Sequence, residues 1–264
     1  PNFLRDIAEM LDNVLEYFIL HAPSAVERAR YSAIRERSIG IGALGFHAYL
    51  QRNHFPWESA QAVGRNKQIF QHIRGKLDEA NLQLGSERGE APDAVGTGKR
   101  FSHMLAIAPN ASSSIIMGNT SPSIEPYRAN AYRQDTLSGA SLNKNKWLDR
   151  IIKGLTQTET EYNDVWSSII ANDGSCQHLD ILDEWQKDVF KTGMEIDQRW
   201  VIQHAADRQE YIDQAQSLNV FFRPDVNVKY LHAVHFQAWK QGLKTMYYCR
   251  SEKLAKADKV SKRI

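Results

Sequence analysis

Cysteine is scarce in this sequence of 264 residues: Cys176 and Cys249 are the only two, and they lie far apart. Because no CxxC pair is present, the chain can build neither a zinc ribbon nor a local redox pair. Free thiols are typical of a reducing compartment, so we expect a cytoplasmic location, the host cytoplasm if the chain is phage-encoded. The sequence also has no apolar run approaching 18 residues and no secretory signal, so it offers no candidate membrane-spanning helix.

A large excess of charge is missing as well. The net charge is only +2 and charged residues make up 24% of the chain, which argues against wholesale disorder and gives no reason to expect direct nucleic-acid binding. The exception is residues 250–264, where six basic and two acidic residues leave a net charge of +4. We interpret this segment as a basic carboxyl-terminal tail and expect residues 1–249 to form one folded unit, without a linker or internal repeat.

Hydrophobic residues make up 42% of the chain, enough for one large core or two modest ones. Short apolar runs of strand character alternate with longer helical patterns, which is typical of crossover units and predicts an α/β fold with a parallel sheet or barrel. One predicted helical stripe near the beginning of the chain consists of Phe3, Ile7, Met10, Leu11, Val14, Leu15 and Phe18. Helices are predicted at residues 3–20, 57–83, 144–155, 159–171, 178–190, 199–216 and 228–242, strands at 101–108, 218–224 and 244–249, and an irregular stretch at about 120–145.

A literal GxGxxG pattern occurs at Gly40–Gly45. Dinucleotide binding would require a strand before it and an acidic residue about 20 positions later, and neither is present. We therefore interpret the pattern as a tight turn that leads into a helix beginning at Phe46.

Two further clusters resemble functional sites only superficially. His232 and His235 are spaced as a metal pair on a helix, but further ligands are missing, so we place them at the edge of the core and predict no metal site. Asp180, Asp183 and Glu184 lie among apolar residues, as on the solvated face of an amphipathic segment.

The segment "LAIAPNASSSIIMGNTSPSIEP", residues 105–126, is more informative. A buried strand ends at Pro109, small and polar residues follow, and then a short apolar run favours a helix with Ser112 or Ser113 as its N-cap. Free backbone N–H groups beside hydroxyls at the end of a parallel strand suit an anion such as phosphate. From the residues alone, an ordinary serine-rich cap explains the segment equally well.

Three motifs together resemble the large, catalytic subunit of class I ribonucleotide reductases, in a version close to those of large tailed bacteriophages. "APNASSSIIMGNTSPSIEP" is similar to the family's phosphate-loop signature, "RERSIGIGALGFHAYL" to its Arg-x-x-Gly-Ile-Gly segment and "LKTMYYC" to its closing strand. They occur in the family's order and span most of the chain. The resemblance implies the carboxyl-terminal half of a ten-stranded α/β barrel with surrounding helices.

The resemblance also implies specific roles. The loop would bind the diphosphate of a ribonucleoside diphosphate, and Tyr247 and Tyr248 would be the last carriers of a radical that the metal cofactor of a small subunit generates. Because adjacent residues in a regular strand point to opposite faces, we predict a local departure from strand geometry that lets the two rings stack. The residues implied in the loop are Pro109, Asn110, Ala111, Ser112 and Ser113.

Other parts of the family's machinery have no match in this sequence. It contains no "NxCxE", and neither cysteine lies in a segment that matches the family's reducing pair. Pro1 is the first residue where a methionine would be expected, so we expect a processed, split or excised piece. The resemblance implies that this chain carries no cofactor and depends on an upstream half that holds the active-site cysteines and the nucleotide effector sites.

The implied partners are that upstream half, the small subunit, thioredoxin or glutaredoxin, and a second large subunit in a homodimer. Two alternatives stay open. The chain could be a non-catalytic assembly or docking module derived from the same barrel, which degenerate motifs would favour. It could also be a relative that uses a glycyl radical, although the tyrosine pair argues against that reading.

Overall fold

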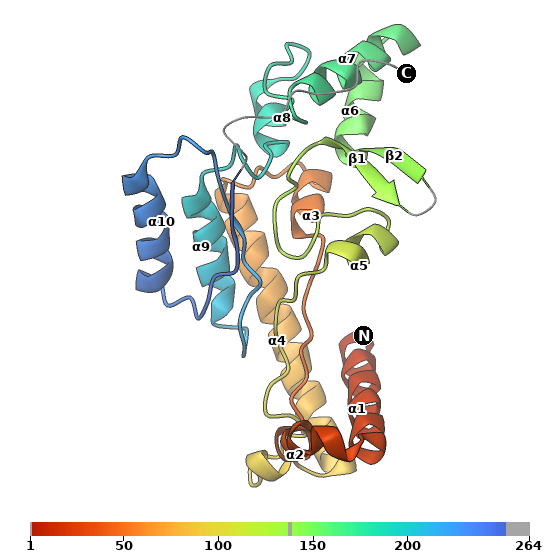
Figure 1. The fold of residues 1–264 in the computed structure, drawn as a ribbon, viewed down its shortest axis with the longest axis vertical. Coiled ribbons are helices and arrows are strands. Elements are labelled where there is room, and N and C mark those ends of the chain that lie inside the picture. Colours follow the sequence, from red (N-terminus) through yellow and green to blue (C-terminus); the bar gives the residue numbers. More distant parts are fainter. Residues whose placement is uncertain (1, 137–138, 252–264) are drawn as a thin grey trace.

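The computed structural model describes residues 2–136 and 139–251. The long helix α4 runs through the middle of the molecule, with α1 and α2 at one end and α6, α7 and α8 at the other (Figure 1). The helices are α1 (Phe3–His21), α2 (Glu27–Glu36), α3 (Phe46–Arg52), α4 (Ala60–Arg88), α5 (Ala111–Ile116), α6 (Lys146–Leu155), α7 (Glu159–Ala171), α8 (Glu184–Val189), α9 (Gln198–Gln209) and α10 (Val228–Lys240), with short 3-10 turns at Ser24–Val26 and Pro92–Ala94. The strands are β1 (Ala131–Thr136), β2 (Gly139–Lys144), β3 (Val220–Phe222) and β4 (Cys249–Ser251).

Four extended segments lie side by side and run parallel, in the same order as in the chain. Ile41 pairs with Leu105, and Ile107 pairs with Gln216, each through a parallel bridge. The third segment continues into β3, which pairs in parallel with β4. Helices connect each segment to the next, as parallel pairing requires. This arrangement is the α/β crossover pattern expected from the sequence.

The main hydrophobic core lies between these segments and the helices. It includes Leu105 and Ile107 from the second segment, Val220 from the third, and Leu77 and Leu84 from α4, all of them buried. A second buried cluster forms under α6, α7 and α8, around Leu148, Ile152, Trp166, Ile169 and Phe190. The residues that the structure describes therefore build one large core and a smaller satellite core.

Two glycines of the GxGxxG pattern have structural roles. A Cβ at Gly42 would lie 2.5 Å from the carbonyl oxygen of Ala106, so the backbones of the first two segments approach too closely for a side chain. Gly45 has a φ of 81° and is the N-cap of α3. The predicted tight turn into a helix is confirmed.

The helix predicted at 3–20 is confirmed as α1, and part of its apolar stripe packs against the main core while Phe3, Met10 and Val14 are exposed. Two other sequence predictions about helices were wrong. The helix predicted at 199–216 ends at Gln209, and the chain then extends to join the parallel segments. The helix predicted at 178–190 is only α8, preceded by turns.

The stretch predicted as irregular at 120–145 contains an antiparallel hairpin, in which β1 pairs with β2 from Ala131↔Lys144 to Thr136↔Gly139. Its sequence alternates weakly and lacks the strong apolar residues that mark a buried strand. Of the predicted basic tail, residues 252–264 lie outside the described residues, whereas Arg250 and Ser251 belong to β4.

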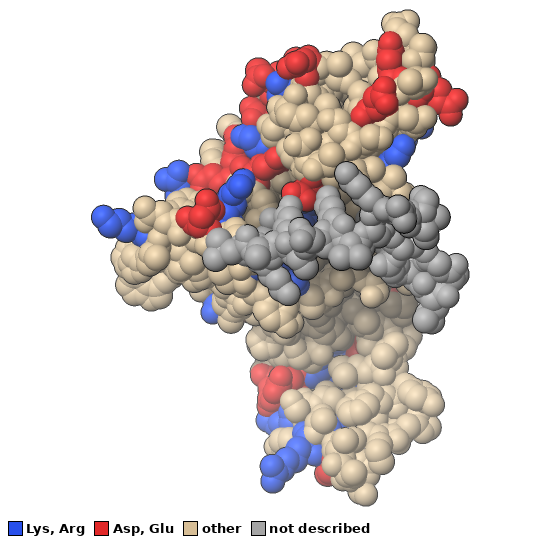
Figure 2. All heavy atoms as spheres, turned by 45° about the horizontal axis from the view of Figure 1, so that its top comes forward, with Lys and Arg blue, Asp and Glu red and all other residues tan. Residues whose placement is uncertain are grey.

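Charge is mixed over the face shown in Figure 2. Acidic side chains gather at the end of the molecule that carries α6 and α7, where Glu159, Glu161 and Asp164 are exposed. Lysine and arginine side chains lie among them and are also scattered over the rest of this face (Figure 2). No helix among the described residues is long and apolar enough to cross a membrane.

Candidate functional site

Tyr247 and Tyr248 precede β4 and depart from regular strand geometry. The N–H of Tyr247 donates to the carbonyl of Leu218 (2.9 Å), and the carbonyl of Tyr248 accepts from the N–H of Val220 (3.0 Å). In a regular parallel ladder, one residue opposite Asn219 would make both of these bonds. Here two consecutive residues share them, which is a β-bulge. The predicted departure from strand geometry is confirmed.

The bulge brings the two rings together. Their centroids lie 4.1 Å apart with an interplanar angle of 50°, so the rings touch but are tilted rather than stacked as predicted. Both side chains are about half exposed. A hydrogen bond with Tyr248 raises the pKa of the Tyr247 hydroxyl, and the guanidinium of Arg250 lies 5.2 Å from the ring of Tyr248. Tyr247 is therefore a neutral phenol near pH 7.

The predicted loop follows the second parallel segment as expected, but its cap differs. Asn110 is the N-cap of α5, without a side-chain hydrogen bond, and Ser112 and Ser113 lie in the first turn of this six-residue helix. The prediction that one of these serines is the N-cap was wrong. Asn110 is half-buried, whereas Pro109, Ala111 and both serines are exposed. The hydroxyls of Ser112 and Ser113 are therefore open to an incoming ligand.

Two buried polar residues that sequence reasoning did not assign connect the loop region to the tyrosines. The Nδ2 of Asn219 donates to Glu125 (2.5 Å), and the Oδ1 of Asn219 accepts from the N–H of Tyr248 (3.0 Å). On the other side, the hydroxyl of Ser123 donates to the carbonyl of Ala108 (2.8 Å), directly before the loop. The only sequence signal was that Glu125 lies in the quoted "SIEP" and Asn219 in the apolar "LNVFF".

Glu125 is buried, with 8% of its surface exposed. Burial raises the pKa of Glu125, and the hydrogen bond from Asn219 and the positive charge of Arg250 oppose that rise. A buried carboxyl group needs such partners, because desolvation without hydrogen bonds is costly.

A cavity of about 660 Å³ lies beside α5. Ala111 and Ser114 of α5, Tyr132 of β1 and Ile170 of α7 are among the residues that line it. Of the residues predicted to hold phosphate, only Ala111 reaches this cavity, so the predicted loop faces outward from it.

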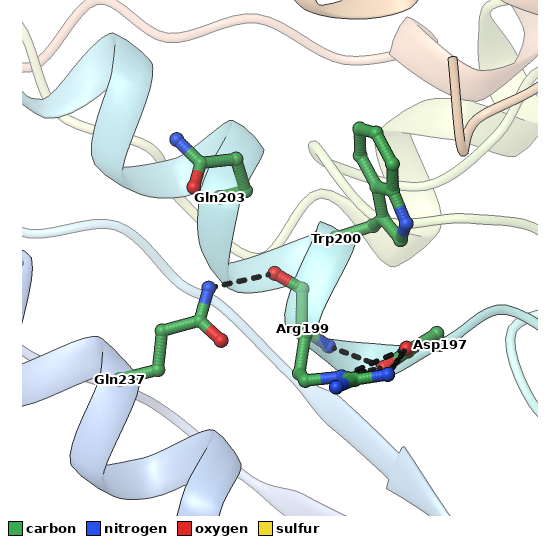
Figure 3. Close-up of a pocket in the computed structure, with 5 residues that line it drawn as sticks. All are labelled: Asp197, Arg199, Trp200, Gln203 and Gln237. Atoms are coloured by element: carbon green, nitrogen blue, oxygen red, sulfur yellow. Dashed lines mark hydrogen bonds and ion pairs between the residues drawn. The ribbon is translucent and has the colours of Figure 1, made fainter.

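A smaller cavity of about 280 Å³ lies between α9 and α10 (Figure 3). Arg199 is paired there with Asp197, and Gln237 donates to the carbonyl of Arg199 (3.1 Å). These polar groups satisfy one another, and Trp200 and Gln203 complete the lining.

The histidine pair on α10 and the acidic residues around α8 have ordinary structural environments. His235 is half-buried and bonded to the carbonyl of Leu231, and His232 is exposed against Phe236. Asp183 is the N-cap of α8. Among residues 2–136 and 139–251, no group of three or more histidine, cysteine or acidic residues is arranged to hold a metal ion.

Comparison with known proteins gives a consistent result. The sequence model of the family described as "Ribonucleotide reductase, barrel domain" matches residues 2–96 and 92–249. The ribonucleoside-diphosphate reductase large subunit of Invertebrate iridescent virus 6 is 57% identical over 261 residues, which cover 98% of this chain and 27% of that protein. The large subunit of Danio rerio is 35% identical over 260 residues, covering 86% of this chain and 32% of that protein.

Among solved structures, the Actinobacillus ureae class Id ribonucleotide reductase alpha subunit superposes with a TM-score of 0.86 at 39% identity, covering 94% of this chain and 46% of that one. The family match and this likeness confirm the predicted α/β class and barrel part. The chain spans less than half the length of each of these proteins. The viral relatives named are iridescent viruses, so the bacteriophage part of the expectation stays a prediction.

Proposed function

The chain belongs to the ribonucleotide reductase barrel family, and on that premise we propose that it works as part of a ribonucleoside-diphosphate reductase. The overall reaction converts a ribonucleoside diphosphate and a dithiol into a 2'-deoxyribonucleoside diphosphate, a disulfide and water. Within it, this chain supplies the substrate phosphate loop and the final tyrosines of radical transfer. It acts in the cytoplasm together with the remaining part of a large subunit, a radical-generating small subunit, and thioredoxin or glutaredoxin as the source of reducing equivalents.

The contact between Tyr247 and Tyr248 carries this proposal. A radical relay needs adjacent groups that can each lose one electron and one proton without leaving a buried charge. Each tyrosine would give one electron and its phenolic proton to the oxidant before it and recover both from the next group. The last donor would be a cysteine thiol of the remaining part of the large subunit, which becomes a thiyl radical. The bulge explains how neighbouring residues can serve as consecutive carriers.

The loop is proposed to hold the substrate diphosphate. Exposed hydroxyls of Ser112 and Ser113 and free N–H groups at the start of α5 are suitable donors for phosphate oxygens. Helix α5 is short, so side-chain hydroxyls and loop amides contribute more than a helix dipole would.

Substitution of each tyrosine tests the relay in the complete enzyme. Tyr247→Phe and Tyr248→Phe each remove one hydroxyl and keep the ring, so we expect normal assembly and turnover reduced to background. Tyr31→Phe is a matched control, because Tyr31 is exposed on α2, far along the chain from the site. Normal turnover in either test variant, with assembly intact, would exclude the relay and favour a non-catalytic docking module.

A separate experiment tests the loop. Ser112→Ala combined with Ser113→Ala should raise the substrate dissociation constant about tenfold or more, because hydrogen bonds to a charged group are lost. Titration calorimetry of the complete large subunit measures this constant, and Ser86→Ala on the exposed face of α4 is the control. An unchanged dissociation constant would contradict the phosphate assignment.

A further inference from the structure

The bulge at the tyrosine pair creates one backbone donor that the parallel ladder cannot satisfy. The N–H of Tyr247 and the carbonyl of Tyr248 make the two ladder bonds, which leaves the N–H of Tyr248 without a backbone partner. The side-chain oxygen of Asn219 accepts from this N–H at 3.0 Å. Asn219 is the residue directly opposite the bulge, so its side chain replaces the missing ladder bond.

The orientation of the Asn219 amide is fixed by a second contact. Its Nδ2 donates to Oε1 of Glu125 at 2.5 Å, and both side chains are buried, at 3% and 8% exposure. Because the backbone N–H of Tyr248 can only donate, it selects the amide oxygen and leaves the amide nitrogen to donate to Glu125. Glu125 and Asn219 thus form a connected pair in which each partner determines the geometry of the other.

Loss of this pair would favour a regular ladder. A regular strand would restore backbone pairing at Tyr248 without help from a side chain, and it would turn adjacent side chains to opposite faces. The two rings, now 4.1 Å apart, would then separate. The polar pair therefore decides whether the bulged or the regular backbone is preferred.

We propose that Asn219 and Glu125 are positioning residues of the radical relay, which hold Tyr247 and Tyr248 in contact by stabilising the bulge. This inference rests on the proposed function. The pair also ties the tyrosines to the phosphate loop, because Glu125 lies two residues after Ser123, whose hydroxyl is bonded to Ala108. Neither residue touches the reacting atoms.

The variants exploit the direction of each hydrogen bond. Asn219→Ala removes the acceptor for Tyr248. Asn219→Asp keeps that acceptor but sets a second carboxylate against Glu125, whereas adding Glu125→Gln supplies a donor again. The double variant Asn219→Asp with Glu125→Gln should therefore recover the kcat that Asn219→Asp alone loses. Asn227→Ala is the control, since it also removes an asparagine that accepts from a backbone N–H, at the start of α10 (2.8 Å).

Two measurements are made on the complete large subunit, with and without its small subunit. Hydrogen exchange at the Tyr248 amide should accelerate about fivefold to tenfold in Asn219→Ala, as expected for one lost hydrogen bond. The kcat should fall about 10- to 100-fold with the KM for the ribonucleoside diphosphate unchanged, because a displaced relay does not weaken substrate binding. The control should keep both the exchange rate and the kcat.

The outcomes separate this inference from the proposed function. If Tyr247→Phe abolishes turnover but Asn219→Ala leaves kcat intact, the positioning role is refuted and the relay stands. If Tyr247→Phe leaves turnover intact, the relay fails, and amide exchange still reports on the hydrogen bond to Tyr248. A kcat that is equally low in Asn219→Asp and in the double variant would also overturn the proposal, since a positioning role requires rescue.

Discussion

Asp12 offers the sharpest prediction about stability. This carboxylate on α1 is 1% exposed and accepts hydrogen bonds from Arg37 (2.7 Å), Arg88 (2.9 Å) and Arg100 (3.1 Å). Burial alone would raise its pKa, but the hydrogen bonds from these arginines, led by Arg100, outweigh burial and lower the pKa of Asp12. The cluster joins α1 to Arg37 at the end of α2, to Arg88 at the end of α4 and to Arg100.

The magnitude follows from the contacts. Each ion pair is worth about 4 kcal/mol at an effective dielectric constant of 20, and desolvation offsets much of this sum. Removing one partner of a buried pair typically costs about 3–5 kcal/mol. Arg88 is partly exposed and can regain water when its partner is lost. We therefore expect Asp12→Asn to lower the free energy of unfolding by about 3 kcal/mol, at the lower end of this range.

Urea denaturation of the chain and its variants measures this difference. Glu16→Gln is the matched control, because Glu16 also pairs with Arg37 but is 45% exposed, and exposed pairs contribute at most about 1 kcal/mol. The folded pKa of Asp12 lies below its unfolded value, so the advantage of the wild type should be constant above about pH 5 and shrink below about pH 4. A loss for Asp12→Asn no larger than that for Glu16→Gln would refute the reasoning.

Three further predictions concern other buried groups. Burial lowers the pKa of His47 to about 3, and its Nδ1 accepts from the N–H of Tyr127. As pH falls from 6.5 to 5, this shift alone should make unfolding easier by about 2 kcal/mol, and His204, whose pKa burial lowers to about 4, adds to the same slope. His47→Asn should therefore reduce the slope, without removing it, in urea titrations at several pH values. Leu148→Ala in the satellite core should lower the free energy of unfolding by about 2–5 kcal/mol, whereas Leu155→Ala, at an exposed position, should lower it by less than about 1 kcal/mol. Equal losses in urea denaturation would contradict the packing of Leu148 in that core. Burial raises the pKa of Cys176 to about 12, whereas Cys249 is exposed. A thiol reagent should therefore label only Cys249 until the protein unfolds, and mass spectrometry of the labelled peptides measures this.

Sequence reasoning succeeded where the signal was local. The apolar residues around Leu105 and the turn residue Gly45 depend on near neighbours, so both the buried segment and the helix after it were predicted. It failed where a local preference lost to distant packing. The helical pattern at 199–216 ended early because the chain must extend to pair with Ile107.

The sequence by itself determined the family, the order of the motifs and the adjacency of Tyr247 and Tyr248. Only the tertiary structure decided that the two rings meet. The bulge depends on Asn219, 29 positions before Tyr248, and Asn219 is oriented by Glu125, 94 positions before it. Periodicity and propensity describe contacts within a few residues, whereas a hydrogen bond between buried side chains depends on which segments the fold places side by side.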